Sequence, residues 1–340
     1  MESNPLQPRF TSDNLTTLQS HILAEEQLHP DATGDFSWIM SAVALAGKTI
    51  ANKVRRARIE DVLGDHGDVN PHGERQQKLD VIANEIIMRC LGDRANIAVL
   101  ASEEGEQPIV LRNREEGGRY CVMFDPLDGS SNLDVCVGVG TIFSILRNER
   151  RKPREMPHYL QPGYRQVAAG YILYGSSVVF VVTTGTGVDM FVLDQSIGAF
   201  VLVATKIRIP AARAIYSVNE AYSDHFPPAY REYLAFAHAE GYSSRYIGSM
   251  VADVHRTLLT GGVFLYPPTK THRGGKLRLV YEANPMAMII EQAGGRAIAG
   301  AARILDLAPT DLHERTSVVM GSPEEVAHVE RFICREQSTV

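Results

Sequence analysis

The sequence predicts an α+β protein in which helices and mixed sheets pack in layers. Apolar residues recur at helical spacing before residue 95, short runs rich in β-branched residues follow up to about residue 200, and helices and strands alternate after it. The chain has 340 residues, of which 44% are hydrophobic, and this suffices for one large layered body or for two domains. We expect an N-terminal domain at 1–200 and a C-terminal domain at 201–340.

Two amphipathic helices are predicted in the N-terminal part. The first covers 36–56, and the Thr-Gly-Asp sequence at 33–35 in front of it predicts an N-terminal cap. The second runs from 79 to 90 with its apolar residues on one face. The segment 64–73 between them is rich in Gly, Asp and His and has little to bury, so we expect a mobile loop there.

Short strands are predicted in the middle of the chain. They are the β-rich runs at 97–101, 120–124, 141–146, 167–173, 178–183 and 190–193. The turn sequence at 183–187 joins the last two, so this region contains an antiparallel or mixed sheet. A second mixed half follows, with helices predicted at 230–238, 250–260 and 286–293 and strands at 263–266, 277–281 and 318–320.

Composition excludes several classes of protein. The formal net charge is −6, and charges of both signs are interspersed, so no basic field is present that would hold nucleic acid. We expect no membrane partner and a cytoplasmic location, because no apolar run is long enough to span a bilayer and no signal-peptide core is visible. The four cysteines (Cys90, Cys121, Cys136 and Cys334) form no C-x-x-C pair, and we expect small buried residues kept reduced.

The segment 124–132, with the sequence Phe-Asp-Pro-Leu-Asp-Gly-Ser-Ser-Asn, is the most informative part of the chain. The apolar run in front of it predicts a buried strand that delivers Asp125 to its carboxyl end, where ligand sites of layered αβ proteins lie. Pro126 fixes one backbone angle of the turn that follows. Asp125 and Asp128 can then both face a hard cation.

Small residues follow the second acid of this motif. Gly129 lets the backbone approach an anion, and the N–H groups of Gly129, Ser130 and Ser131 can surround phosphate oxygens. An ordinary surface turn is the alternative, because Asp-Pro and Asp-Gly steps are common in turns. The ordered combination of two acids, a proline, a glycine and two serines favours a metal-dependent phosphatase site.

Further acids are candidates for the same site. Glu103 and Glu104 directly follow the predicted strand 97–101, although Glu106 nearby leaves open that they are solvated surface charges. Clustered carboxylates repel one another unless divalent cations neutralise them, and oxygen-only ligands suit magnesium or manganese. Two such ions about 3.5–4 Å apart can clamp the attacking and leaving oxygens of an in-line displacement. Asp80 on the second helix is a candidate proton acceptor, with a solvated helix position as the alternative.

The segment 276–282 adds cations and a carboxylate. Lys276, Arg278 and Glu282 occupy alternate positions and share one face if the segment is extended. An edge strand with a polar outer face is the alternative. The Asn-Pro sequence at 284–285 predicts the N-cap and first turn of the next helix, which places Glu282 directly before a helix N-terminus.

With these motifs the chain resembles the class I fructose-1,6-bisphosphatases, which belong to the lithium-sensitive, metal-dependent sugar phosphatases. The resemblance extends from about residue 14 to 334, in blocks at 78–80, 102–104, 124–132, 140–143, 160–163, 168–171, 217–220, 245–256, 275–282 and 284–287. It implies a layered αβαβα fold with two mixed sheets. It also implies hydrolysis of fructose 1,6-bisphosphate to fructose 6-phosphate and phosphate, in gluconeogenesis or the Calvin cycle, with two or more magnesium ions per subunit.

The same resemblance implies the roles of individual residues. The metal ions are surrounded by Glu103, Glu104, Asp125, the Leu127 carbonyl, Asp128 and Glu282, and the groups that help to activate water are Glu74, Asp80 and Glu104. The 1-phosphate faces Asp128, Gly129, Ser130, Ser131 and Arg278. The sugar and the 6-phosphate contact Asn219, Tyr222, Tyr246, Tyr266 and Lys276, and Arg245 reaches the 6-phosphate of a neighbouring subunit.

The resemblance further implies a homotetramer that AMP inhibits at a site beside the N-terminal helix. The residues that match this site are Thr33, Gly34, Asp35, Arg119, Tyr120 and Arg147. Asp35 and Arg119 stand where many relatives carry Glu and Lys. A helix N-terminal turn explains the first three residues without any ligand.

Other functions remain open from the sequence. A sedoheptulose bisphosphatase, a dual sugar bisphosphatase or an inositol phosphatase would use the same metal chemistry. Tyr246, Tyr266 and Lys276 favour a sugar bisphosphate over an inositol phosphate, because the related inositol enzymes lack this set. A non-catalytic relative that binds a sugar phosphate and signals is the alternative from another class. Such a protein is expected to have lost a ligand carboxylate, and this chain retains all of them.

Overall fold

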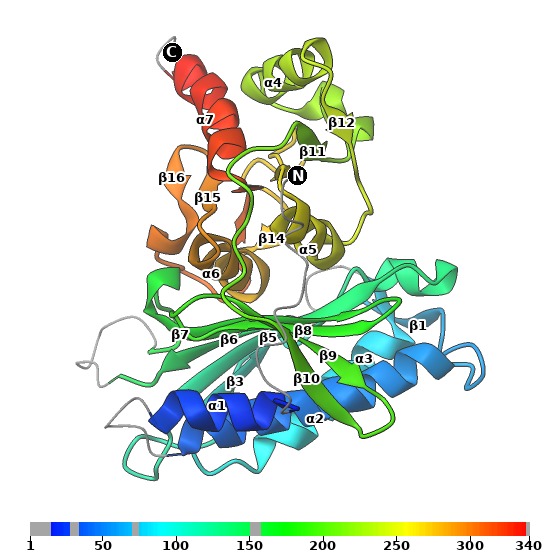
Figure 1. Ribbon diagram of the computed structural model, residues 1–340, viewed down its shortest axis with the longest axis vertical. Coiled ribbons are helices and arrows are strands. Elements are labelled where there is room, and N and C mark those ends of the chain that lie inside the picture. Colours follow the sequence, from blue (N-terminus) through cyan, green and yellow to red (C-terminus); the bar gives the residue numbers. More distant parts are fainter. Residues whose placement is uncertain (1–14, 28–33, 70–74, 150–157, 338–340) are drawn as a thin grey trace.

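The computed structural model describes residues 15–27, 34–69, 75–149 and 158–337. In this part of the chain five layers follow one another, namely helices, an eight-stranded sheet, helices, a six-stranded sheet and helices (Figure 1). The α+β class and the αβαβα layering expected from the sequence are therefore confirmed. None of the described helices combines the length and the apolar composition that a bilayer-spanning segment needs.

The first sheet is built from the middle of the chain. Its order is β10 (Ala199–Ala204), β9 (Asp189–Asp194), β8 (Val178–Thr183), β7 (Gln166–Tyr174), β6 (Val139–Arg147), β5 (Tyr120–Asp128), β3 (Ile97–Ser102) and β4 (Ile109–Val110). β3 and β5 run parallel, whereas the other neighbouring pairs run antiparallel. The sheet is thus mixed as predicted, and β8 and β9 form the predicted antiparallel pair.

Three helices cover one face of this sheet. They are α1 (Leu18–Gln27), α2 (Asp35–Arg56) and α3 (Lys78–Gly92), and their apolar residues pack on the sheet in one continuous core. The predicted cap of α2 is wrong in its chemistry, because the N-cap is Gly34 with φ of 75°. The carboxylate of Glu26 on α1 instead accepts hydrogen bonds from the backbone N–H and the hydroxyl of Ser37. An acid from the preceding helix thus satisfies a donor of the first turn of α2.

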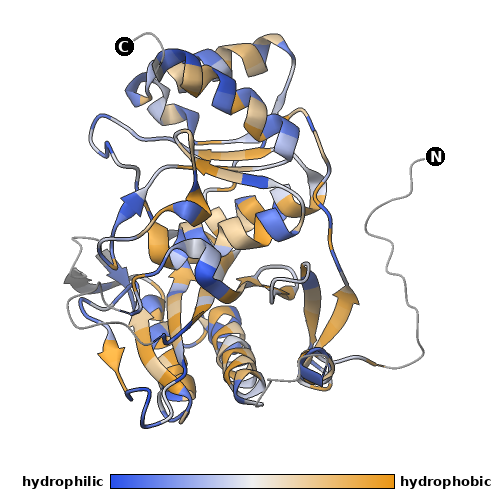
Figure 2. Cartoon of the chain, turned by 90° about the vertical axis from the view of Figure 1, so that its left-hand side faces the viewer, coloured by the Kyte–Doolittle hydropathy of each residue, from blue (hydrophilic) through white to orange (hydrophobic). Residues whose placement is uncertain are grey.

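The second sheet is formed by the C-terminal third. Its order is β12 (Ser243–Ser244), β11 (Ile215–Ser217), β13 (Val263–Tyr266), β18 (Val318–Gly321), β15 (Arg296–Ala299) and β16 (Ala302–Arg303). Between the two sheets lie α5 (Met250–Thr260) and α6 (Asn284–Gln292), and outside the second sheet lie α4 (Pro228–Ala239) and α7 (Pro323–Gln337) (Figure 1). Apolar residues concentrate on the faces that meet between layers (Figure 2), where they form three further cores.

Several local expectations are wrong. The segment expected as a loop at 64–73 contains β1 (Asp65–Val69), which pairs with β2 (Arg75–Gln77), and residues 70–74 lie outside the described part. The cysteines are free thiols, but Cys136 and Cys334 are exposed because their turn and helix positions face solvent. The predicted strand at 277–281 ends after two residues.

That short strand, β14 (Leu277–Arg278), pairs with β17 (Arg315–Thr316) and then gives way to a turn of π-helix at Leu279–Ala283. The π-helical turn continues directly into α6. The N-cap of α6 is therefore Ala283 rather than Asn284, since the backbone is already helical before the Asn-Pro step. Gly294, with φ of 88°, follows the helix.

Candidate active site

A cavity of about 250 Å³ opens where β3 and β5 of the first sheet face α5 and the β14 segment. Most of the residues singled out from the sequence line it. They are Asp80, Glu103, Glu104, Asp125, Leu127, Asp128, Gly129, Ser130, Ser131, Tyr246, Tyr266, Lys276, Arg278 and Glu282. Residues more than 200 positions apart in the chain thus share one cavity.

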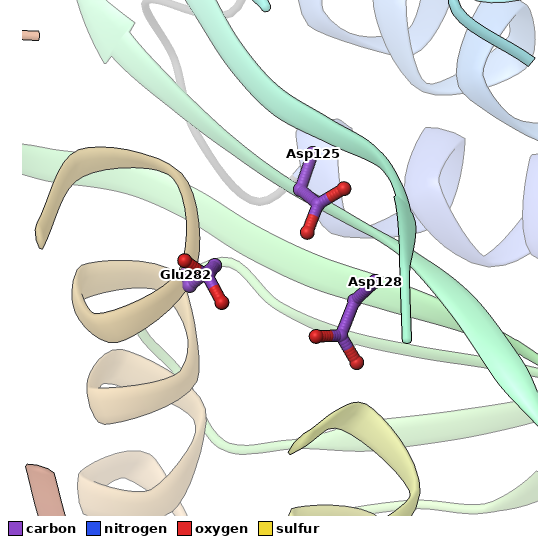
Figure 3. A group of neighbouring side chains, drawn as sticks. All are labelled: Asp125, Asp128 and Glu282. Atoms are coloured by element: carbon purple, nitrogen blue, oxygen red, sulfur yellow. The ribbon is translucent and has the colours of Figure 1, made fainter. Parts of the chain in front are cut away.

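Three buried acids form the deepest part of this cavity. Asp125, Asp128 and Glu282 each offer one carboxylate oxygen, and these oxygens lie within 4.8 Å of one another. Figure 3 shows the three side chains directed into a common space from β5 and from the π-helical turn. All three are nearly inaccessible to solvent. An all-oxygen donor set of this size fits a hard divalent cation.

A β-bulge explains why both aspartates of β5 face the same side. In a regular strand, residues three positions apart point to opposite faces of the sheet. Here Asp125 is opposite Ile142 and Asp128 is opposite Gly140, so β5 contains one residue more than β6 over this stretch. The Thr141 hydroxyl donates to the Pro126 carbonyl over 2.8 Å and holds the bulge. The expected turn after the strand is thus a bulge within it.

The π-helical turn brings the third acid. The expected alternation of Lys276, Arg278 and Glu282 on one strand face is wrong, since the strand ends at Arg278. The helical backbone that follows carries Glu282 back, so that its Oε2 accepts a 2.6 Å hydrogen bond from the N–H of Arg278. The three side chains still line one cavity. The sequence pattern therefore predicted their convergence but not the backbone that produces it.

Arg278 supplies the compensating positive charge. Its guanidinium forms an ion pair with the carboxylate of Glu103, which follows β3. Both side chains are buried. Glu103 also donates its backbone N–H to the carbonyl of Phe124 over 3.0 Å, which ties the residue after β3 to β5. Among the described residues of the cavity, one buried cation thus faces several buried carboxylates, because Lys276 is exposed.

The acids are difficult to ionise together. Burial raises the pKa of Asp125 and of Glu282 well above the ordinary range, and the carboxylate of Glu103 adds to both shifts. Burial raises the pKa of Asp128 to about 7, although the N–H of Val251 and the hydroxyl of Ser249 favour its charged form. Because burial and uncompensated negative charge cause these pKa shifts, a bound divalent cation would lower the pKa values again.

Asp80 approaches the site from the first turn of α3. Its Oδ2 accepts hydrogen bonds from the Gln77 N–H over 2.9 Å and from the Ser130 hydroxyl over 3.0 Å. Burial raises the pKa of Asp80 to about 7, against the effect of the Gln77 hydrogen bond, and the charge of Glu104 adds to the shift. Glu104 is half-buried and accepts from the Gln76 amide. The expected partner Glu74 lies outside the described residues.

The loop after Asp128 has the geometry of an anion site. Gly129 has φ of 76°, and a turn of 3₁₀-helix at Ser130–Val135 follows it. A Cβ at Gly129 would lie 2.7 Å from the Ser249 hydroxyl, so only glycine fits against α5. Residues 129–131 line the cavity, and backbone N–H groups of such a turn are suitable donors to a phosphate.

Three predicted sugar-binding residues do not line the cavity itself. Asn219 lies close to the side chain of Tyr246, which lines the cavity. Tyr222 and Arg245 are exposed. The Arg245 guanidinium donates to the backbone carbonyl of Ser244 over 2.7 Å.

Sequence reasoning did not assign a role to six residues that line the cavity, namely Gly248, Ser249, Met250, Asp253, Phe264 and Leu277. Ser249 directly precedes α5, and a serine in front of an apolar helical pattern is an N-cap signal. Its hydroxyl instead donates to Asp128 Oδ2 over 3.2 Å. The sequence therefore marked Ser249 as a helix start, but the contact of its hydroxyl with Asp128 is visible only in the structure.

A second predicted group lies at the N-terminus of α2. Asp35 pairs with Arg119 over 2.9 Å, and the Arg147 guanidinium lies 6.0 Å from the ring centroid of Tyr120. Tyr120 and Arg147 are opposite each other on β5 and β6. Gly34 provides the N-cap. Five of the six residues thus gather in one place, and Thr33 lies outside the described residues.

Comparisons with known proteins agree over the length of the chain. Residues 16–205 match the family model of the fructose-1-6-bisphosphatase N-terminal domain, and residues 209–334 match that of the C-terminal domain. The class 1 fructose-1,6-bisphosphatase of Chlorobium phaeobacteroides is 48% identical over 327 residues, which cover 94% of this chain and 98% of that protein. The class 1 enzyme of Chloroherpeton thalassium is 47% identical, with coverage of 94% and 93%.

Solved structures show the same relationship. The fructose-1,6-bisphosphatase of Leishmania major in its holo form superposes with a TM-score of 0.88 at 42% identity, covering 94% of this chain and 99% of that one. The structure of the same enzyme described as the T-state superposes with a TM-score of 0.83 at 41% identity and equal coverage.

Proposed function

The chain belongs to the class 1 fructose-1,6-bisphosphatase family, and from this premise we propose that its cavity hydrolyses fructose 1,6-bisphosphate to fructose 6-phosphate and phosphate. The observation that carries the proposal is the convergence of Asp125, Asp128 and Glu282 beside the backbone loop that begins at Gly129. Acids that need divalent cations and donors that suit a phosphate lie in one cavity. This combination is what phosphoryl transfer to water requires.

The family is metal-dependent, and we propose that this chain binds two or more magnesium ions, with manganese as the alternative. The oxygen donors would come from Glu103, Glu104, Asp125, the Leu127 carbonyl, Asp128 and Glu282. When bound, divalent cations neutralise these carboxylates and the charge that develops on the phosphoryl group. The raised pKa values of Asp125 and Glu282 support this assignment, because buried acids of this kind are stabilised by a cation.

Asp80, with Glu104 and Glu74, would accept the proton of the attacking water. Asp80 lines the cavity, and its pKa of about 7 suits a group that exchanges protons near neutral pH. Its hydrogen bond from Ser130 ties it to the phosphate loop. Attack in line with the leaving sugar oxygen then completes the transfer.

The remaining lining residues would hold the substrate. The loop at 128–131 and Arg278 would face the 1-phosphate, and Tyr246, Tyr266 and Lys276 would face the sugar and the 6-phosphate. Asn219 and Tyr222 would contribute from the side of Tyr246. We further propose a homotetramer in which Arg245 reaches the 6-phosphate of a neighbouring subunit, because this arginine is exposed beside the cavity.

The group at the N-terminus of α2 would bind AMP. Gly34, Asp35, Arg119, Tyr120 and Arg147 gather there, together with Thr33 by sequence. Arg119 is paired with Asp35, so a phosphate would have to replace the carboxylate as its partner. Isothermal titration of AMP against wild type and Arg119→Met tests this site, and equal heats for both proteins would exclude it.

Phosphate release from purified protein tests the proposed function. Wild type with magnesium is assayed on fructose 1,6-bisphosphate and, in parallel, on sedoheptulose 1,7-bisphosphate and inositol phosphate. We expect the fructose substrate to give the highest kcat/KM and a metal chelator to abolish turnover. Preference for the seven-carbon sugar would reassign the substrate, and binding without turnover would identify a sugar-phosphate sensor.

A further inference from the structure

The turn at 247–249 and the start of α5 contact Asp128 and the loop that follows it at several points. Asp128 Oδ2 accepts from the Ser249 hydroxyl and, over 2.8 Å, from the N–H of Val251. The carbonyl of Gly248 accepts from the Asn132 amide over 2.9 Å. Gly129 lies directly against Ser249, where a Cβ would collide. The position of this turn therefore sets the distance between α5 and the loop at 128–132.

Asp253 holds the turn in place. Its carboxylate accepts hydrogen bonds from the N–H of Ile247 over 2.9 Å and of Gly248 over 3.0 Å. The Ser217 hydroxyl at the end of β11 donates to it over 2.7 Å. Asp253 is 1% exposed and belongs to the first turns of α5, from which helical side chains point back toward the N-terminus. One buried carboxylate thus joins the second sheet to the turn.

We propose that Asp253 is a positioning residue for the hydrolysis, which acts by fixing Asp128 and the phosphate loop relative to each other. The inference rests on the proposed function. It adds a residue whose carboxylate is hydrogen-bonded by Ser217, Ile247 and Gly248 rather than by the phosphate loop at 128–131. Its influence passes through the turn at 247–249, and from there to the acid and the loop.

The energetics of a buried carboxylate support this role. Removing a buried acceptor leaves its donors unsatisfied, and the backbone N–H groups of Ile247 and Gly248 would then have to move toward other partners. Gly248 has φ of 87°, a conformation that glycine adopts without strain, so the hydrogen bonds to Asp253 fix a backbone that is otherwise free to move. A shift of about 1 Å in a positioned group can reduce turnover by about 100-fold. Metal affinity would also fall, because Asp128 would lose its fixed orientation.

Asp253→Asn tests the inference, with Thr257→Val as the matched control. Asparagine keeps the size of the side chain, but its NH₂ group replaces one carboxylate oxygen and cannot accept a hydrogen bond from the backbone N–H of Ile247 or Gly248. Thr257 is equally buried on the same helix, and its hydroxyl donates to the Asp253 carbonyl over 2.9 Å without contacting the turn. We measure kcat and KM, the affinity for manganese by calorimetry, and the thermal midpoint without metal.

For Asp253→Asn we expect kcat and the manganese affinity each to fall by about 10-fold or more, with KM changed by less. Thr257→Val should lower the thermal midpoint and leave the other quantities unchanged. If Asp253→Asn lowers only the thermal midpoint, or if both variants lose manganese affinity alike, the positioning role is wrong.

Two further results keep the inference separate from the proposed function. Absence of turnover in wild type would contradict the proposed function, whereas the manganese titrations would still test the position of Asp128. If Asp253→Asn does not fold, Ser217→Ala removes one anchor of the carboxylate and should lower kcat and manganese affinity by about twofold or more. Unchanged values in a folded Ser217→Ala protein would then overturn the inference.

Discussion

The backbone N–H of Arg278 donates to the carboxylate of Glu282 over 2.6 Å, while the guanidinium of the same arginine pairs with Glu103. Arg278 thereby joins an acid from the π-helical turn to an acid that follows β3. Both contacts are buried. The arginine is therefore part of the metal-free fold as well as of the site.

Arg278→Met should destabilise the metal-free protein strongly. Breaking a buried ion pair leaves a carboxylate without compensation and costs about 3–5 kcal/mol of unfolding free energy. Urea unfolding in the presence of a chelator measures this loss, and magnesium should restore part of it. Arg89→Met is the control, because Arg89 forms an exposed pair with Glu85 on α3 and should change stability by less than about 1 kcal/mol. Equal losses in the two variants would contradict the prediction.

Asp125→Asn should stabilise the metal-free protein and abolish turnover. Burial and the repulsion of neighbouring acids raise the pKa of Asp125, so this carboxyl group lowers the stability of the folded state at any pH above its unfolded-state pKa. A neutral amide removes this repulsion but is a poor ligand for a hard cation. We expect a higher thermal midpoint in chelator and a loss of kcat of about 1,000-fold or more. A lower midpoint together with retained activity would show that Asp125 is not a metal ligand.

Gly129→Ala should reduce turnover far more than Gly198→Ala. Both glycines have positive φ, 76° and 64°, so the backbone cost of the substitution is similar. A Cβ at Gly129 would lie 2.7 Å from the Ser249 hydroxyl, whereas a Cβ at Gly198 meets nothing within 4 Å. Comparison of kcat should show a loss of about 100-fold for Gly129→Ala only. Similar losses in both would mean that backbone strain, not packing against α5, determines the effect.

The attachment of α1 to the first sheet should weaken as the pH rises. His21 contacts Asp189 of β9 over 2.8 Å, and the pKa of His21 is raised above 6.5, chiefly by this hydrogen bond and also by the nearby charge of Glu25. A histidine with a raised folded-state pKa contributes stability that is fully present below pH 6.5 and is lost as the pH passes the folded-state value. The contribution is about 1 kcal/mol or less.

Hydrogen exchange of α1 at pH 6 and pH 8.5 measures this dependence. Wild type should exchange faster at the higher pH, after correction for the intrinsic rate, and His21→Gln should remove the difference. His225→Gln, at an exposed histidine of the 3₁₀-turn Glu220–His225, serves as control and should behave as wild type. Persistence of the difference in His21→Gln would assign it to another group.

The sequence predicted six of the eight strands of the first sheet, but only β13 and β18 among the six strands of the second. Helices α2, α3 and α5 and strands such as β8 were predicted within a few residues. The bulge in β5 and the π-helical turn before Glu282 were not, because both depend on contacts from distant segments, such as the Thr141 hydroxyl on Pro126. The local patterns favoured a strand followed by a turn for the first segment and a regular strand for the second.

The same distinction applies to the site. Asp125 and Glu282 could be proposed from local patterns and a family resemblance, since acids near predicted strand ends stand out in a sequence. Asp253 could not, because its importance arises from a turn that it holds across space. Its neighbours in the sequence are those of an ordinary helix start.

The proposed cation ligands are distributed over the β5 bulge, the end of β3 and the π-helical turn, and none of these elements carries the whole proposed set. Affinity for a divalent ion therefore requires that the first sheet and the layer of α5 and α6 are docked together. A bound manganese ion consequently reports on assembly of the layers. As denaturant is increased, we expect the ion to be released before the helical circular-dichroism signal is lost. The bound ion is then a probe of the order in which the layers separate and the helices unfold.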